Sequence, residues 1–477
     1  MKRFIGRKNE LAKLNDLYQT KGFQMAVIYG RRRIGKSTLI TKFIEDKKAI
    51  YYMATKVGAE RNVELLGKEV MKLFAPGLKG ISFEKLEDLL EFIGENLKEE
   101  KVILVIDELP FWAECDEGML SVLQKFIDQN FAEKELFLIL CGSSLSFMEE
   151  KVLSEKSPLF GRRTAQLKIR EFNYLEAAEF VPEYSYEDKA LCYGITGGVA
   201  KYLSIIEPEK TIEQNIKALF FEKEGYLYDE PRNLLVQEFS DTSLVNNIIE
   251  QIASGETSLS VIAAKVHEKD ATVLYSIQRL IAVGLIEKRR CITEENNRRK
   301  VQYRLKDTMF KFWYTYIPMA VSAIELGKGE VYFENVVKKS LHHYMGDIFE
   351  KMCRYATLMW GLDGKLNAFV SEVGIWWGNE TLIEPDGKKR AQSADVDIVG
   401  LAPASKGMVV GECKYKNEKI DKEIYEVLIR RSKAIPCKYK VVQYLFFSLS
   451  GYTEWVLQNV DKSMIKLLTL EDIYTSI

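Results

Sequence analysis

The sequence predicts an α/β protein of several domains, with a parallel sheet first, a mainly helical region next and a second α/β unit last. Three observations lead to this prediction. An apolar run over 25–29 leads through a glycine-containing loop into an amphipathic helical pattern, which is typical of a parallel sheet covered by helices. Helical patterns dominate from about 173 to 318, and short apolar strands reappear after Gly361. The length of 477 residues favours about three domains over one hydrophobic core.

Composition and charge are those of an ordinary soluble globular protein. Apolar residues make up 47% and charged residues 29%, and the formal net charge is −1. A nearly neutral chain can contact nucleic acid only through local basic patches. The seven cysteines form no CxxC pair, which argues against a disulfide framework or a zinc site. We find no apolar run that could span a bilayer and no signal-peptide core, so we expect a cytoplasmic protein without a membrane partner.

The first motif is Gly30-x-x-x-x-Gly35-Lys36-Ser37, between the apolar run and the helical pattern. Glycines let the backbone curl so that its N–H groups face phosphate oxygens, and the helix presents its N-terminus to the same anion. The lysine can reach the β- and γ-phosphates, and the serine hydroxyl can ligate Mg²⁺. The sequence therefore predicts a P-loop that binds a nucleoside triphosphate. The residues expected at the nucleotide are Gly30, Arg31, Arg32, Arg33, Ile34, Gly35, Lys36, Ser37 and Thr38.

A second apolar run, Val102 to Ile106, ends in Asp107 and Glu108. Its continuous apolar character is expected of a strand buried on both faces of a parallel sheet, and such sheets bind ligands at the carboxyl ends of their strands. We expect Asp107 to hold Mg²⁺ beside the nucleotide, directly or through water. We expect Glu108 to orient or deprotonate the attacking water. The upstream P-loop gives this acidic pair its meaning, because alone it would indicate only a strand end.

Two further polar groups follow a third apolar run, LFLILCGSSLSFM. Ser143 and Ser144 could hydrogen-bond the γ-phosphate or the attacking water, or they could cap the next helix, and the sequence favours neither. Arg162 and Arg163 come after a glycine. An arginine near the γ-phosphate stabilises charge in the transition state, and we interpret one of the two, Arg162 in preference, as this residue. The alternative is a pair of solvated surface arginines.

Together with FIGRKNELAKL and GITGGVAKYL, these segments resemble, in this order, the archaeal-type ATPases of the AAA+/STAND group, which also occur in bacteria. The resemblance implies ATP as the nucleotide, an ATPase core over 1–172 and a helical lid over 173–238. It also implies that Gly6 and Arg7 lie close to the adenine. The chain departs from the group at Ala200, where its members usually carry proline.

Residues 239–318 contain three helical patterns and then two short strands around a polar tip. This order predicts a winged helix, a variant of the helix-turn-helix. The third helix is expected to expose few residues that could bind a DNA groove. They are Thr272, Ser276, Gln278 and Arg279. Contact with DNA, and packing on the ATPase to report its nucleotide state, are therefore equal alternatives. The cations of the wing, which could follow nucleic-acid phosphates, are Lys288, Arg289, Arg290, Arg298, Arg299 and Lys300.

The last predicted domain, 319–477, has a long helical stretch and then the order β-β-β-α-β. The segments SADVDIVGL and GMVVGECKY place Asp397 on one strand and Glu412 and Lys414 on its hairpin neighbour. Because side chains alternate across a strand, Glu412 and Lys414 share a face. Two carboxylates that meet there can bind divalent cations, which activate water and stabilise the leaving oxygen in phosphodiester hydrolysis.

This pattern resembles the PD-(D/E)XK nuclease superfamily, in the form attached to archaeal-type ATPases as a C-terminal domain. The resemblance implies that Asp397 and Glu412 are catalytic metal ligands and that Glu350, from the preceding helix, completes the site. It implies that Lys414 positions or deprotonates the water or neutralises the scissile phosphate. Asp397 is preferred to Asp395 because an apolar pair follows it. The alternative is a structural domain with a charged, solvated edge.

Three functions follow from these interpretations. The first is an ATPase that couples its nucleotide state to a DNA-directed, metal-dependent nuclease. The second is an ATP-dependent switch that binds DNA or a protein and whose nuclease-like domain does not cut. The third is a protein-directed ATPase with scaffold domains. The set of two acids and a lysine favours the first, whereas the near-zero net charge favours the others. An arginine that acts in trans would require a second copy or a partner protein.

Overall fold

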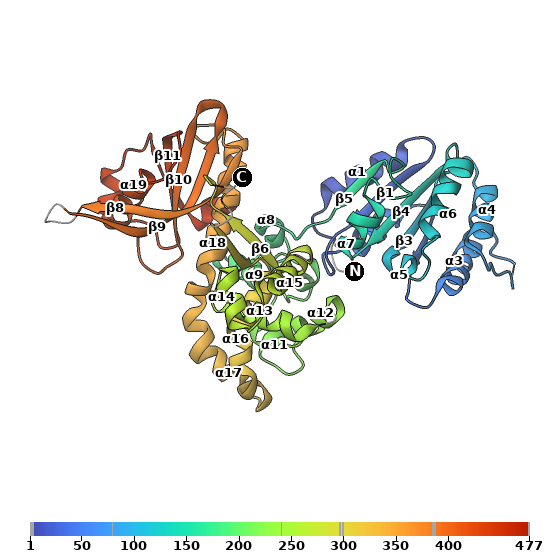
Figure 1. Cartoon of the computed structure of the whole chain (residues 1–477), viewed down its shortest axis with the longest axis horizontal. Coiled ribbons are helices and arrows are strands. Elements are labelled where there is room, and N and C mark those ends of the chain that lie inside the picture. The colour runs from blue at the N-terminus through green and yellow to red at the C-terminus, as the bar shows by residue number, and fades with distance from the viewer. Residues whose placement is uncertain are drawn as a thin grey trace. The chain divides into compact units, whose positions relative to one another are not determined.

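The computed structural model describes residues 4–78, 80–239, 241–294, 297, 300–383 and 388–475 (Figure 1). The chain forms two compact units. The first unit consists of Met1–Phe172 and Val199–Ile205, and the second of Asn173–Gly198 and Ile206–Ile477. The chain therefore crosses between the units three times, and a short piece of the first unit interrupts the sequence of the second.

A five-stranded parallel sheet forms the centre of the first unit, as predicted. The strand order β2-β3-β4-β1-β5 places the strand before the P-loop between β4 and β5. Since all strands run in the same direction, the carboxyl ends of β1, β3 and β4 meet at one edge of the sheet. The strands are β1 (Gln24–Tyr29), β2 (Ala49–Met53), β3 (Val102–Asp107), β4 (Leu136–Gly142) and β5 (Ala165–Lys168).

Both faces of this sheet are covered by helices. Alternate residues of β1 enter opposite cores: Met25 and Val27 pack on the side of α3, α4 and α6, and Ala26 and Ile28 on the side of α1 and α2. This double burial is why β1, β3 and β4 are apolar except at their ends, where β1 begins with Gln24 and β3 ends with Asp107. The helices are α1 (Lys8–Gln19), α2 (Lys36–Ile44), α3 (Ala59–Phe74), α4 (Leu86–Asn96), α5 (Leu109–Ala113), α6 (Met119–Phe126), α7 (Leu145–Phe147) and α10 (Ala200–Ser204).

The second unit begins with helices whose ends are defined by side chains. Asn173 and Thr211 cap α8 and α11, and in each case a Glu or Gln three residues later returns a hydrogen bond, which satisfies the free N–H groups of the first turn. The helices before the next region are α8 (Tyr174–Ala178), α9 (Tyr186–Thr196), α11 (Ile212–Phe220) and α12 (Glu230–Glu238).

Three helices and an antiparallel ribbon follow, in the predicted order. They are α13 (Thr242–Ala253), α14 (Leu259–Lys265), α15 (Asp270–Ala282), β6 (Ile286–Arg290) and β7 (Val301–Leu305). One prediction for α15 is wrong: Ser276 is buried, because it lies one turn from Val273 and Leu280 on the face that packs into the core. Thr272 and Gln278 are exposed, as expected. The predicted wing residues Arg298 and Arg299 lie outside the described residues.

The C-terminal part is a mixed five-stranded sheet against a long helix (Figure 1). Its strand order is β12-β11-β10-β9-β8, with β9 antiparallel to both neighbours and β10, β11 and β12 parallel. The elements are α16 (Thr308–Glu325), α17 (Gly329–Tyr332), α18 (Lys338–Leu362), β8 (Glu372–Ile383), β9 (Lys389–Ala402), β10 (Gly407–Lys414), α19 (Lys422–Ser432), β11 (Lys440–Ser448), α20 (Glu454–Asn459), β12 (Ile465–Thr469) and α21 (Leu470–Thr475).

The segment Val199–Ile205, which includes α10, departs from the predicted boundaries. The sequence assigns it to the lid, but it belongs to the first unit, where the N–H of Lys201 donates to the carbonyl of Arg33 in the P-loop over 3.0 Å. The division of the remainder into lid, winged helix and C-terminal domain stays a prediction, since all three fall within the second unit. Among the described residues, no helix is both long and apolar enough to cross a membrane.

Candidate functional site

The P-loop joins β1 to α2 through backbone conformations that require glycine. Gly30 has φ 151° and Gly35 has φ 89°. A Cβ at Gly30 would lie 2.3 Å from the carbonyl oxygen of Ile169 and 2.6 Å from Cδ1 of Ile34, so a side chain cannot fit there. The loop therefore turns tightly under the N-terminus of α2, where N–H groups and the helix dipole favour an anion.

Lys36 lies at the first position of α2 and is buried. Its ammonium group donates to the carbonyl oxygens of Gly30 and Arg31, each over 3.0 Å. The charge is thus held inside the loop, at the place where the β- and γ-phosphates of a nucleotide would compete for it. This position agrees with the role predicted for Lys36.

Arg7 supports the loop from below. Its guanidinium donates to the carbonyl of Ile34 over 3.1 Å and to the carbonyl of Arg170 over 2.6 Å, and it lies 4.0 Å from the ring centre of Phe172. A Cβ at Gly6 would meet the same ring at 2.7 Å. The predicted Gly6–Arg7 pair therefore fixes the shape of the P-loop, and its closeness to adenine stays a prediction.

The two residues predicted to bind Mg²⁺ meet at the sheet edge. The Ser37 hydroxyl donates to Oδ2 of Asp107 over 2.7 Å, and the N–H of Glu108 donates to Oδ1 over 2.9 Å. Tyr51, which was not identified from the sequence, donates its hydroxyl to the same Oδ2 over 2.5 Å. Burial, together with this hydrogen bond, raises the pKa of Tyr51. A hydroxyl and a carboxylate are the hard oxygen donors that Mg²⁺ prefers, so these residues fit the ion.

Glu108 is held in place by Ser143 at the end of β4. The Ser143 hydroxyl donates to Oε2 of Glu108 over 2.8 Å, and the Ser143 N–H donates to the same oxygen over 3.2 Å. Glu108 itself has φ 51°, a strained value for a residue with a side chain. Ser144 occupies the N-cap position of α7, but its side chain makes no capping hydrogen bond within the described part of the chain. Ser143 therefore has a role that the sequence did not predict.

The two candidate arginines are engaged within the first unit. The Arg162 guanidinium binds both oxygens of Asp128, at 2.8 and 2.6 Å, and also the carbonyls of Pro158 and Phe160. Arg163 donates to the carbonyl of Leu153 over 2.9 Å. The hydrogen bond and charge of Arg162 lower the pKa of Asp128. To act on a γ-phosphate, Arg162 would first have to leave Asp128, and this catalytic role stays a prediction.

A second group of charges, which we call the acid–lysine site, consists of Glu350, Asp397, Glu412 and Lys414. The register of β9 and β10 pairs Gly411 with Ile398, which places Asp397 and Glu412 side by side one step further on. The N–H of Cys413 donates to Oδ2 of Asp397 over 2.9 Å. Lys414 forms an ion pair with Oε1 of Glu412. The structure therefore brings the predicted residues together.

The fourth member, Glu350, reaches the site from α18. Arg354, one turn later, donates to Glu350 over 3.2 Å and to the carbonyl of Asp397 over 2.9 Å, so it ties α18 to β9. This arginine was not identified from the sequence. Asp395, the competitor of Asp397, is 68% exposed and is paired with Arg431 at 3.0 Å. These environments support the choice of Asp397.

Burial is the main cause that raises the pKa values of two carboxylates of this site, Asp397 and Glu350. Burial raises the pKa of Asp397 well above its ordinary value, and the charges of Glu412 and Glu350 raise it further. Burial also raises the pKa of Glu350, against the effect of Arg354. For Lys414, burial alone would lower the pKa, but the charge and hydrogen bond of Glu412 outweigh it and raise the pKa.

The fit of a divalent cation rests on one oxygen. Within the described residues, Oε2 of Glu412 is buried and receives no hydrogen bond, although Oε1 is bound to Lys414. A cation between Glu412 and Asp397 would satisfy it. The described part of the chain contains no group of three or more His, Cys, Asp or Glu side chains placed to hold a metal ion. Mg²⁺ does not require such a group, because it usually binds through one or two carboxylates, several waters and a substrate phosphate.

Comparisons with known proteins match both parts of the chain. Residues 4–206 match a family of ATPase domains predominantly from Archaea, and 313–425 match a family of archaeal and bacterial proteins of unknown function. The uncharacterized protein MJECL04 of Methanocaldococcus jannaschii is 30% identical over 442 residues, which cover 91% of this chain and 92% of that protein. The Walker-type ATPase PABY2304 of Pyrococcus abyssi is 19% identical, with a TM-score of 0.49 over 65% of this chain and 96% of the other.

The P-loop, the Ser37–Asp107 pair and the match over 4–206 define a P-loop ATPase of the archaeal type. The chain belongs to the same family as MJECL04 of Methanocaldococcus jannaschii. The predicted ATPase domain is thereby confirmed. The winged helix and the nuclease-like domain stay predictions.

Proposed function

We propose that this protein hydrolyses ATP and couples its nucleotide state to divalent-metal-dependent cleavage of phosphodiester bonds in DNA by the acid–lysine site. The observation that carries the second half of the proposal is the meeting of Asp397, Glu412 and Lys414 beside Glu350, from two strands and a helix. Burying a charged group without a partner costs free energy. Perturbed carboxyl pKa values are concentrated at functional sites.

For ATP, each residue has a role that follows from its contacts. The P-loop N–H groups and Lys36 bind the phosphates, and Ser37 and Asp107 would hold the Mg²⁺ that neutralises their charge. Glu108, held by Ser143, accepts the proton of the attacking water, while the water oxygen bonds to the γ-phosphorus and the bond to the β-phosphate oxygen breaks. Loss of Glu108 should therefore affect hydrolysis and leave binding intact.

Coupling is supported by the segment Val199–Ile205. It meets the P-loop at Arg33, and the Cβ of Ala200 lies 3.3 Å from where a Cβ on Gly35 would be. On both sides the sequence continues into the second unit. A shift of the P-loop on nucleotide binding would move Lys201. That movement would be passed along the chain to α9 on one side and α11 on the other. This gives the nucleotide state a covalent route to the second unit.

For DNA, the acids and the lysine divide the work. Asp397 and Glu412 would hold a divalent cation, which would supply an activated water and stabilise the charge that develops on the phosphate. Glu412 can offer its free Oε2 to the cation while Oε1 keeps Lys414 in place, and the Lys414 ammonium group would donate a further N–H to a non-bridging oxygen of the scissile phosphate. One water is added across the phosphorus–oxygen bond, and the leaving sugar oxygen takes up a proton.

A second function is favoured by one observation. Lys414 is already paired with a candidate metal ligand, and within the described residues the site offers only two neighbouring strand carboxylates and Glu350 on the helix. An ATP-dependent switch that binds DNA or a protein, with a site that does not cut, would have the same fold. The two functions differ in whether metal binding and cleavage occur.

Plasmid cleavage tests the proposal. Negatively supercoiled plasmid, in which local separation of the two strands is favoured, is incubated with the full chain and Mg²⁺ or Mn²⁺, with and without ATP. The wild type should nick or linearise it, and Asp397→Asn and Lys414→Ala should not, while ATP hydrolysis by both variants persists. Lys462→Ala, at an exposed position, is the matched control and should cut normally. Glu108→Gln, which should bind ATP and hydrolyse it slowly, shows whether binding or hydrolysis governs cleavage. Two negative results together would favour the ATP-dependent switch. The first is that no plasmid is cleaved, and the second is that calorimetry detects no metal binding to Glu108→Gln without nucleotide.

A further inference from the structure

A large cleft lies inside the second unit, next to the acid–lysine site. Its volume is about 890 Å³. Its walls are the β6–β7 ribbon, one side of α16, the first half of α18 and the residues that follow β10, Tyr415 to Glu418. Glu350, Cys413 and Lys414 also line it. The acid–lysine site therefore opens into this cleft, through the lysine on one side and the helix carboxylate on the other.

The cleft is positively charged in a chain that is not. Of the described residues that line it, eight are lysine or arginine and four are aspartate or glutamate, whereas the whole chain has a formal net charge of −1. Such a concentration of one sign in a concave site focuses the field on an anion. The ligand that this charge fits is a chain of phosphates.

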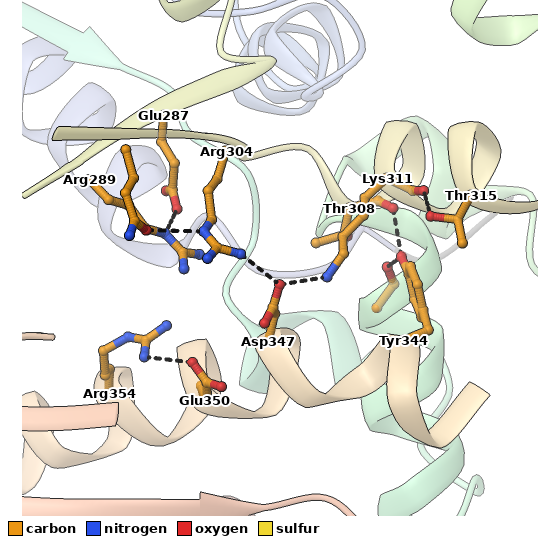
Figure 2. A network of polar contacts seen from close by, with 12 residues as sticks. Glu287, Arg289, Arg304, Thr308, Lys311, Thr315, Tyr344, Asp347, Glu350 and Arg354 are labelled. Atoms are coloured by element: carbon orange, nitrogen blue, oxygen red, sulfur yellow. Dashed lines mark hydrogen bonds and ion pairs between the residues drawn. The ribbon is translucent and has the colours of Figure 1, made fainter. Parts of the chain in front are cut away.

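An ion network holds the walls in place. Figure 2 shows Arg304 of the ribbon and Lys311 of α16 on either side of Asp347 of α18, at 3.7 and 2.9 Å. Burial would raise the pKa of Asp347, but the charges of Lys311, Arg304 and Arg289 outweigh it and lower the pKa. Arg289 is in turn paired with Glu287, 2.5 Å away. Because three elements share this network, the ribbon is fixed opposite the acid–lysine site.

Two lysines that line the cleft are available to bind an anion. Lys339 on α18 and Lys416 after β10 are both exposed and line the cleft. Neither ammonium group has an ion-pair partner among the described residues. Unlike Arg304 and Lys311, they gain a partner and lose none when a phosphate arrives, so they should contribute most to the affinity for a polyanion.

The volume of the cleft favours a single strand of nucleic acid over a duplex as the ligand. Pockets of about 300–1,000 Å³ hold small molecules, and a cleft of about 890 Å³ is at the upper end of that range. It can take a few nucleotides of an extended strand, but a duplex with its two backbones needs a much wider seat. We infer that the cleft seats a single strand of nucleic acid, with phosphates at Lys339 and Lys416 and the scissile phosphate at Lys414. This inference rests on the proposed function of the acid–lysine site.

Strand binding can be measured apart from cleavage. The probe is a fluorescein-labelled, 12-nucleotide oligothymidylate in EDTA, titrated with full-length Asp397→Asn and followed by fluorescence anisotropy. Adding Lys339→Glu or Lys416→Glu should weaken binding about tenfold or more and reduce the slope of log affinity against log salt by about one per lysine removed. Adding Lys462→Glu, an exposed lysine outside the cleft, should change neither quantity. A 12-base-pair duplex should bind more weakly than the strand.

The possible results distinguish strand binding in the cleft from cleavage at the acid–lysine site. Equal weakening by all three lysine variants, tighter binding of the duplex, or full displacement of the strand by thymidine monophosphate at similar affinity would each overturn the inference. If Lys339→Glu still cuts plasmid normally on the wild-type background and binds the strand normally, the proposed function stands and the cleft does not seat the strand. If the wild type never cuts but the cleft variants lose the strand, the cleft is a strand-binding site and the proposed cleavage fails.

Discussion

Asp107 ends an apolar strand segment and Asp397 precedes one, and the surroundings of the two carboxylates differ. Asp107 is fully buried and receives hydrogen bonds from Ser37, Tyr51 and the backbone N–H of Glu108. Asp397 receives one backbone N–H, and burial, followed by the charges of Glu412 and Glu350, raises its pKa. Both oxygens of Asp107 therefore receive hydrogen bonds without a ligand. Asp397 has less compensation for its charge, and we expect a cation at the acid–lysine site to reduce the repulsion between its carboxylates.

The largest expected effect removes the centre of the first site. Lys36→Ala takes away the ammonium group that the P-loop carbonyls hold, so ATP binding and hydrolysis should fall by a factor on the order of 10²–10³. Metal binding at the acid–lysine site should not change. Titration with a fluorescent ATP analogue and phosphate release measure the first effect. Lys42→Ala, an exposed lysine on the same helix, is the control and should behave as wild type; near-normal turnover in Lys36→Ala would mean that the loop does not bind the triphosphate.

The second prediction concerns pH and the repulsion at Asp397. Its pKa is higher in the folded than in the unfolded chain, so between the two values the folded chain holds more protons. Stability should therefore fall as pH rises through that interval, and the penalty is complete above the folded pKa. In EDTA, Asp397→Asn should be more stable than wild type at neutral pH, and the difference should shrink as pH falls. Thermal unfolding across the pH range measures this.

Two controls sharpen this test. Asp395→Asn, on the same strand but exposed, should show no advantage that grows with pH. Saturating Mg²⁺ or Mn²⁺ should reverse the order of wild type and Asp397→Asn, because only the wild type gains the free energy of metal binding, about 2.7 kcal/mol at a hundredfold excess over Kd. A wild type that is the more stable protein at every pH in EDTA would contradict the account of repulsion.

The smallest expected effect tests how finely the first site is tuned. Ser143→Ala removes the hydroxyl that donates to Glu108 and leaves the backbone N–H. A hydrogen bond to a charged group contributes about 1.5–3 kcal/mol, so turnover should fall by about one to two orders of magnitude if the bond positions the base, with ATP affinity unchanged. Steady-state kinetics separate kcat from KM. A rise in kcat would show instead that Ser143 holds Glu108 away from the water.

How much the sequence predicted depended on how far apart the partners lie along the chain. The P-loop is one continuous segment whose geometry follows from its glycines, and the acidic end of β3 follows from an apolar run, so both were predictable. Tyr51, Ser143 and Arg354 act through the order of strands or the packing of a helix on a strand, which periodicity does not encode. Ser276 was misplaced because a small polar residue on a core-facing stripe looks like a surface residue in sequence.

The return of Val199–Ile205 to the first unit has a consequence for cutting and exchanging the parts of this protein. No single cut separates the units, because a fragment that ends at Phe172 lacks the piece that meets the P-loop. A fragment that begins at Asn173 would carry that piece without its partners and would expose Tyr202 and Leu203, which are buried in the intact chain. Recombination between relatives can therefore exchange the ATPase unit only by replacing both of its segments together.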